Sequence, residues 1–280
     1  MKGGAQITWL PDGKRMHLHH GPIDLIVEIW GAGQTVAYQC AALRFQTVLQ
    51  ELVDELPKLR QAADLQACFH GGIARAMQGA VEWHLPGFVT PMAAVAGAVA
   101  DEIARVIAEA PNIDKAYVNN GGDVALVLGP NEEMVADLGG GIARATLHGS
   151  GCVRGVATSG WRGRSLSFGI ADAVTVLASS AALADVAATL IANEVDVPGH
   201  PGIVRAVADS QQLDSDLGDR LVTVDVPRLS PPDVFAALQR GKAFALRLSP
   251  SAGVWGGVLA LQGQVVAFGD PSLGKAIAAA

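Results

Sequence analysis

Apolar and polar positions alternate near the start of the chain, which predicts β-strands. Two such runs, Ile7–Leu10 and Arg15–His20, flank the turn Pro11-Asp12-Gly13-Lys14 and predict a hairpin. A third run, Leu25–Trp30, predicts a strand that ends before Gly31-Ala32-Gly33. We therefore expect the chain to open with β-structure.

Apolar residues at helical spacing follow in several longer segments. Between Ala37 and Leu56 this spacing predicts a helix, and Pro57 is expected to end it. Three further helices should follow capping residues: Pro91–Ala110 after Thr90, Ala181–Glu194 after Ser179-Ser180, and Pro232–Gln239 after Ser230, with Gly241 as a stop. The glycine-rich segment 59–86 predicts a loop with short helical or extended pieces.

Strands are also expected between and after these helices. The apolar runs that predict them are Lys115–Asn119, Val124–Leu128, Ile142–Leu147, Cys152–Ala157, Ala173–Ala178 and Leu221–Val226, with two last strands around the glycines at 256–257 and 263. Strands and helices mix without strict βαβ alternation, which predicts an α+β fold. No linker or low-complexity segment divides the sequence, so we expect a single domain over residues 1–280.

Two alanine-rich segments resemble each other. They are Ala93–Ala100 and Ala181–Ala188, and each follows a Thr or Ser cap. Either an old duplication or chance likeness between two alanine-rich helices explains this similarity. Small side chains at these positions permit close contact between helices.

Composition narrows the class of protein. Hydrophobic residues make up 50% of the chain and charged residues 17%, which suffices for a sizeable core. The net charge of −7 argues against a nucleic-acid partner. Three scattered cysteines fit a reducing compartment, and the N-terminus shows no apolar leader. The most apolar stretch, 173–192, contains Asp185 and is a poor membrane span. We therefore expect a cytoplasmic protein without a membrane partner, and a homodimer is plausible.

Two polar, glycine-containing stretches interrupt the apolar strands. The first is Asn119-Asn120-Gly121-Gly122-Asp123, which is either an ordinary hairpin turn or a place where the backbone approaches a ligand closely. The second is Ala157-Thr158-Ser159-Gly160, which is either a strand end or a binder of carbonyl or phosphate oxygens. Nearby, Trp161-Arg162-Gly163-Arg164 is either an exposed loop or a clamp for a carboxylate or phosphate.

The third unusual feature is a carboxylate inside an apolar helix. Asp185 has no Lys or Arg at helical spacing, and Thr189 shares its helix face. A buried carboxylate needs a cation or several hydrogen bonds. A carboxylate beside a hydroxyl suits a hard cation such as Mg²⁺. The alternative is an aspartate at the solvated edge of the helix.

These stretches, in this order, resemble the ApbE-like superfamily, whose best-known members are FAD:protein FMN transferases. The matching elements are Pro91–Asp101, Asn120-Gly121-Gly122-Asp123, Ala157-Thr158-Ser159-Gly160 and Ala184-Asp185-Val186-Ala187-Ala188-Thr189. The resemblance is best over residues 88–195. It implies the tunnelling-type (T-fold) α+β architecture. It also implies Asp185 and Thr189 as metal ligands, with a flavin pocket formed by Asn120, Gly121, Gly122, Asp123, Thr158, Ser159 and Gly160.

The chain also departs from the transferase pattern. Ala96 stands where the transferases carry Lys, and the segment 167–172 lacks their His and Pro. The segment Thr90–Gly97 is instead shared with a short, uncharacterised cytoplasmic branch of the superfamily. We therefore expect a protein that binds a flavin, pterin or nucleotide with Mg²⁺. The alternatives are a non-catalytic binding or assembly protein and an FMN transferase, and catalytic residues are not assigned.

Overall fold

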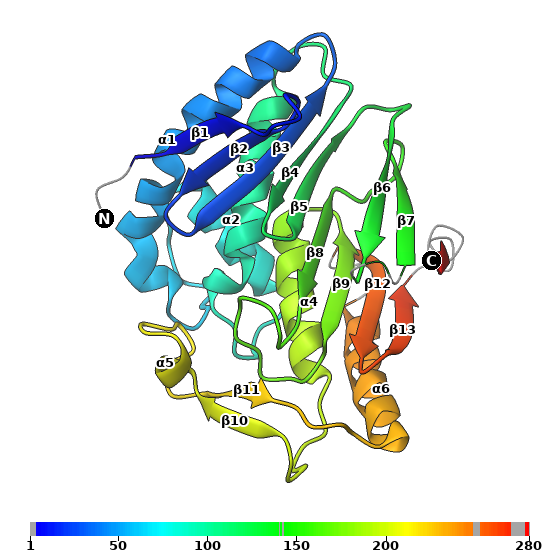
Figure 1. Cartoon of the computed structure of the whole chain (residues 1–280). Helices are drawn as coiled ribbons and strands as arrows, with labels where there is room; N and C mark the ends of the chain where they lie inside the picture. Colours follow the sequence, from blue (N-terminus) through cyan, green and yellow to red (C-terminus); the bar gives the residue numbers. More distant parts are fainter. Residues whose placement is uncertain (1–3, 140, 142, 249–252, 270–277, 280) are drawn as a thin grey trace.

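The chain forms one large antiparallel sheet with helices on one of its faces (Figure 1). The computed structural model describes residues 4–139, 141, 143–248, 253–269 and 278–279. In spatial order the strands of this sheet are β1 (Gln6–Trp9), β2 (Met16–His20), β3 (Ile23–Trp30), β4 (Lys115–Asn120), β5 (Asp123–Leu128), β8 (Gly155–Ser159), β9 (Ala173–Ala178), β12 (Val254–Leu261) and β13 (Gln264–Gly269). The predicted α+β class is confirmed.

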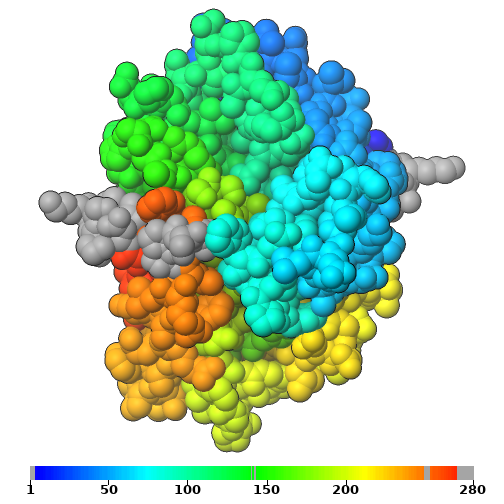
Figure 2. Space-filling model, turned by 180° about the vertical axis from the view of Figure 1, so that it is seen from behind, coloured from blue at the N-terminus to red at the C-terminus, as the bar shows by residue number. Residues whose placement is uncertain are grey.

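The helices bury one face of the sheet. They are α1 (Gln34–Leu59), α2 (Gly72–Glu82), the 3₁₀ turn η1 (Pro91–Ala94), α3 (Val95–Ala108), α4 (Ala181–Glu194) and α6 (Pro231–Arg247). One apolar cluster joins α1, α2 and α3 to β2–β5, and a second joins α4 and α6 to β8, β9 and β12. Seen from behind, α6 (orange) and the region of α1 and α2 (blue to cyan) form much of the surface, whereas most of α4 is buried (Figure 2).

Smaller elements complete the structure. The strands β6 (Glu133–Leu138) and β7 (Ala143–His148) form a sheet with β14 (Ala278–Ala279) and pack on the face opposite the helices. A separate excursion consists of β10 (Val204–Val207), α5 (Ala208–Gln211) and β11 (Leu221–Asp225). Among the helices of the described residues, none has the length and apolar character needed to cross a membrane.

The connectivity repeats. The order strand–strand–helix–helix–strand–strand describes β2-β3-α1-α3-β4-β5 and again β8-β9-α4-α6-β12-β13. The two halves meet at β5 and β8, where the register pairs only Val124 with Val156 and Ala125 with Gly155. Of the two similar alanine-rich segments, the first spans the end of η1 and the start of α3 and the second lies in α4, and α3 and α4 hold different places in their halves. Their likeness is therefore no evidence for the repeat.

Two expected helix ends are wrong. Helix α1 continues past Pro57 to Leu59, whose side chain is fully buried. Helix α6 passes through Gly241, where a β-carbon would lie 2.4 Å from Val195 Cγ2. Glycine is therefore present at 241 for close packing. The segment 59–86 also contains a full helix, α2, rather than short pieces alone.

Candidate functional site

The glycine turn between β4 and β5 presents two polar side chains to the helices. Asn120 pairs with Asp123 in the strand register, so Gly121 and Gly122 form a two-residue turn, with φ of 65° and 119°. Positive φ at both positions is typical of the tight hairpin turn that glycine favours. The Asn120 side-chain amide donates to the Ala96 carbonyl oxygen at 3.0 Å, which ties the turn to α3.

Helices α3 and α4 cap each other with carboxylates. The Gly97 amide, in the first turn of α3, donates to Asp185 Oδ2 at 3.1 Å. In return, Asp101 of α3 accepts from the amides of Ala181 at 2.9 Å and Ala182 at 2.8 Å. The helices approach closely because position 97 has no side chain: a β-carbon there would lie 2.2 Å from the Ala181 carbonyl oxygen. Asp185 is thus partly explained as a helix cap.

The capping hydrogen bond from Gly97 does not offset the free-energy cost of burying the charged Asp185 carboxylate between these helices. Burial raises the pKa of Asp185 well above its usual value, the charge of Asp123 raises it further, and the backbone amides of Gly97 and Ala96 act in the opposite direction. Burial also raises the pKa of Asp123 to about 7, against smaller lowering effects from the Thr158 backbone and the Arg164 charge. Two neighbouring carboxylates in such surroundings favour a shared proton or a bound cation.

Asp123 has an unused acceptor. Its Oδ1 atom is buried and has no hydrogen-bond partner among the described residues. Both Asp123 and Asp185 keep some exposed surface, because they line a cavity of about 430 Å³. A buried acceptor without a donor costs free energy, and at a cavity wall a ligand or a metal ion can relieve that cost.

The cavity combines apolar walls with this acidic end. Its apolar walls include Phe88, Met92, Phe168, Leu190 and Leu217, and its polar lining includes Asn120, Asp123, Asp185, Thr189 and, at the mouth, Arg164. The Phe88 and Phe168 rings lie 6.4 Å apart between centroids. The excursion 204–225 closes one side, where the Thr90 hydroxyl donates to the Asp216 carboxylate. The cavity lies at the seam between the two halves of the sheet.

The second polar motif is divided by the sheet. The Thr189 hydroxyl donates to Ser159 Oγ at 3.5 Å on the helix side. The Thr158 side chain points to the opposite face, where its hydroxyl lies 2.8 Å from that of Thr175. At Gly160 a β-carbon would lie 2.5 Å from the Asp172 carbonyl oxygen. Of the predicted set, Asn120, Asp123, Asp185 and Thr189 line the cavity, and Ser159 touches it only through its hydrogen bond with Thr189. The other predicted residues, Gly121, Gly122, Thr158 and Gly160, are not part of the cavity lining.

Any metal ion at this site would need ligands beyond carboxylates. Within the described residues no group of three or more His, Cys, Asp or Glu side chains gathers to hold a metal ion. The oxygen atoms at hand are the Asp123 and Asp185 carboxylates and the Thr189 hydroxyl. Water or a ligand's own oxygens would complete the shell, which is the usual arrangement for Mg²⁺.

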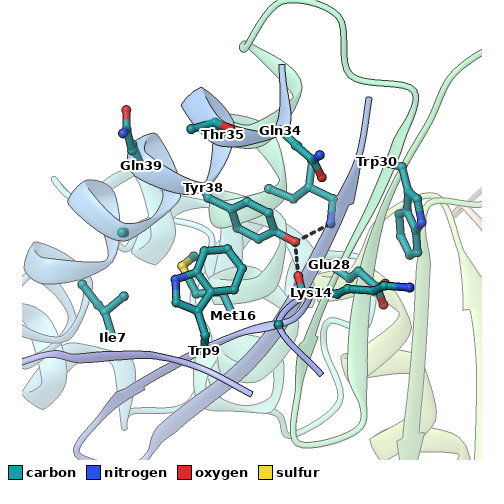
Figure 3. A pocket seen from close by; sticks show the side chains of 13 residues that line it. Ile7, Trp9, Lys14, Met16, Glu28, Trp30, Gln34, Thr35, Tyr38 and Gln39 are labelled. Atoms are coloured by element: carbon teal, nitrogen blue, oxygen red, sulfur yellow. Dashed lines mark hydrogen bonds between the residues drawn. The ribbon is translucent and has the colours of Figure 1, made fainter. Parts of the chain in front are cut away.

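A larger cavity of about 720 Å³ lies elsewhere, between α1 and the first strands (Figure 3). Trp9 and Tyr38 meet edge to face there, with ring centroids 4.7 Å apart. The Tyr38 hydroxyl is already satisfied, since it accepts from the Ile29 amide at 3.0 Å and donates to the Lys14 carbonyl oxygen at 2.7 Å. None of the predicted site residues lines this cavity. The smaller cavity is the better candidate site, because convergent polar groups line it and two of them are carboxylates with strongly raised pKa values.

Several site features were not foreseen from the sequence. Asp101 was named only as the last residue of a segment that matches the family pattern. Phe88 lies between the irregular segment 59–86 and the Thr90 cap, where no element was predicted, and Asp216 comes from an excursion whose first strand was not predicted. Only tertiary packing brings these residues together.

The fold and the cavity define the class: an α+β protein with an acidic cavity of the size that holds a small molecule. The sequence model of the family described as AbpE bacteria matches residues 7–267, and the chain belongs to this ApbE-like family. A UPF0280 protein of Methanopyrus kandleri is 38% identical over 192 residues, which cover 64% of this chain and 74% of that protein.

Other relatives match over shorter segments. A UPF0280 protein of Methanothrix thermoacetophila is 39% identical over 113 residues, or 38% of this chain and 46% of that protein. A UPF0280 protein of Methanococcoides burtonii is 35% identical over 127 residues, or 42% of this chain and 51% of that protein. The chain thus spans about half the length of these two relatives. The names of these relatives assign no reaction.

Proposed function

We propose that the cavity binds a flavin, pterin or nucleotide together with Mg²⁺. Asp185 and Thr189 hold the metal ion, and Asn120 and Asp123 orient the ligand. The observation that carries this proposal is the carboxylate pair beside the cavity, with one Asp123 oxygen buried and unpartnered. Mg²⁺ bound there would offset the burial and the repulsion from Asp123 that together raise the pKa of Asp185.

The shape of the cavity fits a ligand with a flat apolar part and a charged part. Its volume of about 430 Å³ lies within the roughly 300–1,000 Å³ of typical small-molecule sites. Phe88 and Phe168 contribute aromatic rings to the lining, with one face of Phe88 covered by the Arg220 guanidinium, and Asp123 and Asp185 contribute carboxylate oxygens. When bound, Mg²⁺ would supply charge stabilisation for a phosphate group of the ligand.

The family resemblance also implies an architecture and a cellular location, and both are part of the proposal. The repeated strand–strand–helix–helix–strand–strand connectivity supports the tunnelling-type architecture. A cytoplasmic location is part of the proposal, and the free state of Cys40, Cys68 and Cys152 supports it. The homodimer stays a prediction.

Binding without group transfer is the second candidate function. The residue at the start of α3 is Ala96, whose carbonyl oxygen accepts from Asn120 and whose side chain carries no charge. The loop before β9 contributes Phe168 to the cavity in a segment that has no histidine. These positions supply no lysine or histidine for the chemistry of the transferases, which favours a binding protein over an FMN transferase.

Mass spectrometry of small molecules released from the purified protein tests the proposal. The protein would be prepared with Mg²⁺ throughout, in parallel with Asp185→Asn and with Asp101→Asn, a matched buried carboxylate outside this cavity. We expect a flavin, pterin or nucleotide in the wild type and in Asp101→Asn, and its loss from Asp185→Asn. An empty wild type that also gains no thermal stability from Mg²⁺ with FAD, FMN or pterins would refute the proposal.

A further inference from the structure

Arg164 lies at the mouth of the cavity and has no partner among the described residues. It is exposed, and no described carboxylate forms an ion pair with it. Its neighbour Arg162 differs, because Arg162 Nε donates to Asp172 Oδ1 at 3.2 Å. Of these two cations on the same loop, one is held by a protein carboxylate and the other faces the cavity.

The glycine turn provides the place where the Arg164 guanidinium lies. A β-carbon on Gly121 would come within 1.7 Å of Arg164 Nη2, so any side chain there would displace the guanidinium. Gly121 is therefore needed twice: for its φ of 65° and for the space that Arg164 occupies. This contact places the guanidinium against the turn, while its N–H donors remain available to a ligand.

The distribution of charge around the cavity indicates which ligand group Arg164 would bind. Arg164 is the cation that acts on Asp123, yet burial still dominates the pKa of that carboxyl group. The mouth of the cavity thus carries a positive charge, and its inner end carries two carboxylates that suit Mg²⁺. A phosphate group is attracted to both the metal ion and the guanidinium, and arginine binds phosphate oxygens in a bidentate manner.

We propose that Arg164, positioned by Gly121, is the anion-binding residue of the cavity and selects phosphorylated ligands, whose phosphate lies between Arg164 and the metal ion. This inference rests on the proposed function, since it assumes Mg²⁺ at Asp185 and Thr189. It adds that an unphosphorylated ring compound binds less tightly than its phosphate ester. The alternative is that Arg164 only screens the charge of Asp123.

Calorimetric titration with pyrophosphate in the presence of Mg²⁺ tests the role of Arg164. We expect Arg164→Gln to weaken pyrophosphate binding about ten- to hundredfold, the range for loss of charge-assisted hydrogen bonds. Gly121→Asn should weaken it as well, because asparagine tolerates positive φ but occupies the space of the guanidinium. The matched control, Arg162→Gln, should bind like the wild type.

A second comparison uses riboflavin and FMN, which differ by one phosphate group. Arg164→Gln should reduce the affinity for FMN and leave the affinity for riboflavin unchanged. Pyrophosphate binding that is absent in the wild type, unchanged in Arg164→Gln, or equally weakened in Arg162→Gln would overturn the role of Arg164. Titration of Mg²⁺ alone separates the two proposals: if wild type binds Mg²⁺ and Asp185→Asn does not, the proposed function stands even where the role of Arg164 fails.

Discussion

The two carboxylates that cap α3 and α4 should respond in opposite ways to substitution. Asp101 accepts two amide hydrogens, from Ala181 and Ala182, which are 0% and 3% exposed. Asp101→Ala leaves both amides unpaired. Each unpaired buried amide costs about 1–3 kcal/mol, and relief of the carboxylate's own desolvation offsets part of the sum, so we expect a loss of about 2–4 kcal/mol.

This loss of unfolding free energy corresponds to a measurable decrease in the melting temperature, Tm. Unfolding entropy is roughly 2.1 cal/mol/K per residue, which gives about 0.6 kcal/mol/K for a chain of 280 residues. Asp101→Ala should therefore lower Tm by about 3–7 °C. Differential scanning calorimetry at pH 8 without divalent cations measures it.

Asp185→Asn should behave differently under the same conditions. The amide oxygen of asparagine can still accept from Gly97, whereas the charge that burial and Asp123 penalise is removed. We expect an unchanged or raised Tm without Mg²⁺, and loss of the stabilisation that Mg²⁺ gives the wild type. If Asp185→Asn keeps the stabilisation that Mg²⁺ gives the wild type, the role of Asp185 as a metal ligand would be refuted.

Three further predictions follow from the same contacts. The pKa of Asp123, about 7 in the folded protein against an ordinary 3.8, means that the folded state binds its proton more tightly. Metal-free wild type should therefore lose stability as pH rises from about 4 to about 7, and Asp123→Asn should flatten this part of the profile in chemical denaturation. Gly97→Ala should destabilise by about 1–3 kcal/mol or more, because its β-carbon meets the Ala181 backbone; an unchanged denaturation midpoint would contradict the close helix contact. Gly241→Ala should cost less in the same assay, since it meets side-chain atoms that can shift.

Elements with strong local signals could be predicted from the sequence. Strand β9 and helix α4 have the expected bounds. A run that is apolar except for Thr175 defines the strand, and a serine cap defines the helix start, where the Ser180 hydroxyl accepts from the Leu183 amide at 3.2 Å. The proline and glycine signals failed where tertiary packing outweighed local preference, at Pro57 and Gly241. Strand β6 was missed because its residues alternate between exposed and half-buried positions and include charged side chains.

The site was predictable in its components but less so in its geometry. Asp123 and Asp185, 62 positions apart in the sequence, were both named from local oddity, and the structure brings them to one cavity. Thr158 points to the other face of the sheet, because successive strand residues alternate and Ser159 takes the helix side. The contact of Arg164 with Gly121 joins residues from different hairpins, which no local pattern reveals.

The candidate site combines residues from both halves of the repeat, which meet at β5 and β8. Asn120 and Asp123 come from the first half of the repeat, whereas Asp185, Thr189 and Arg164 come from the second half. Neither half carries a complete set of ligand-binding groups. A shorter chain with a single half could form this cavity only by pairing with another polypeptide, so fusion of two halves makes the site independent of protein concentration.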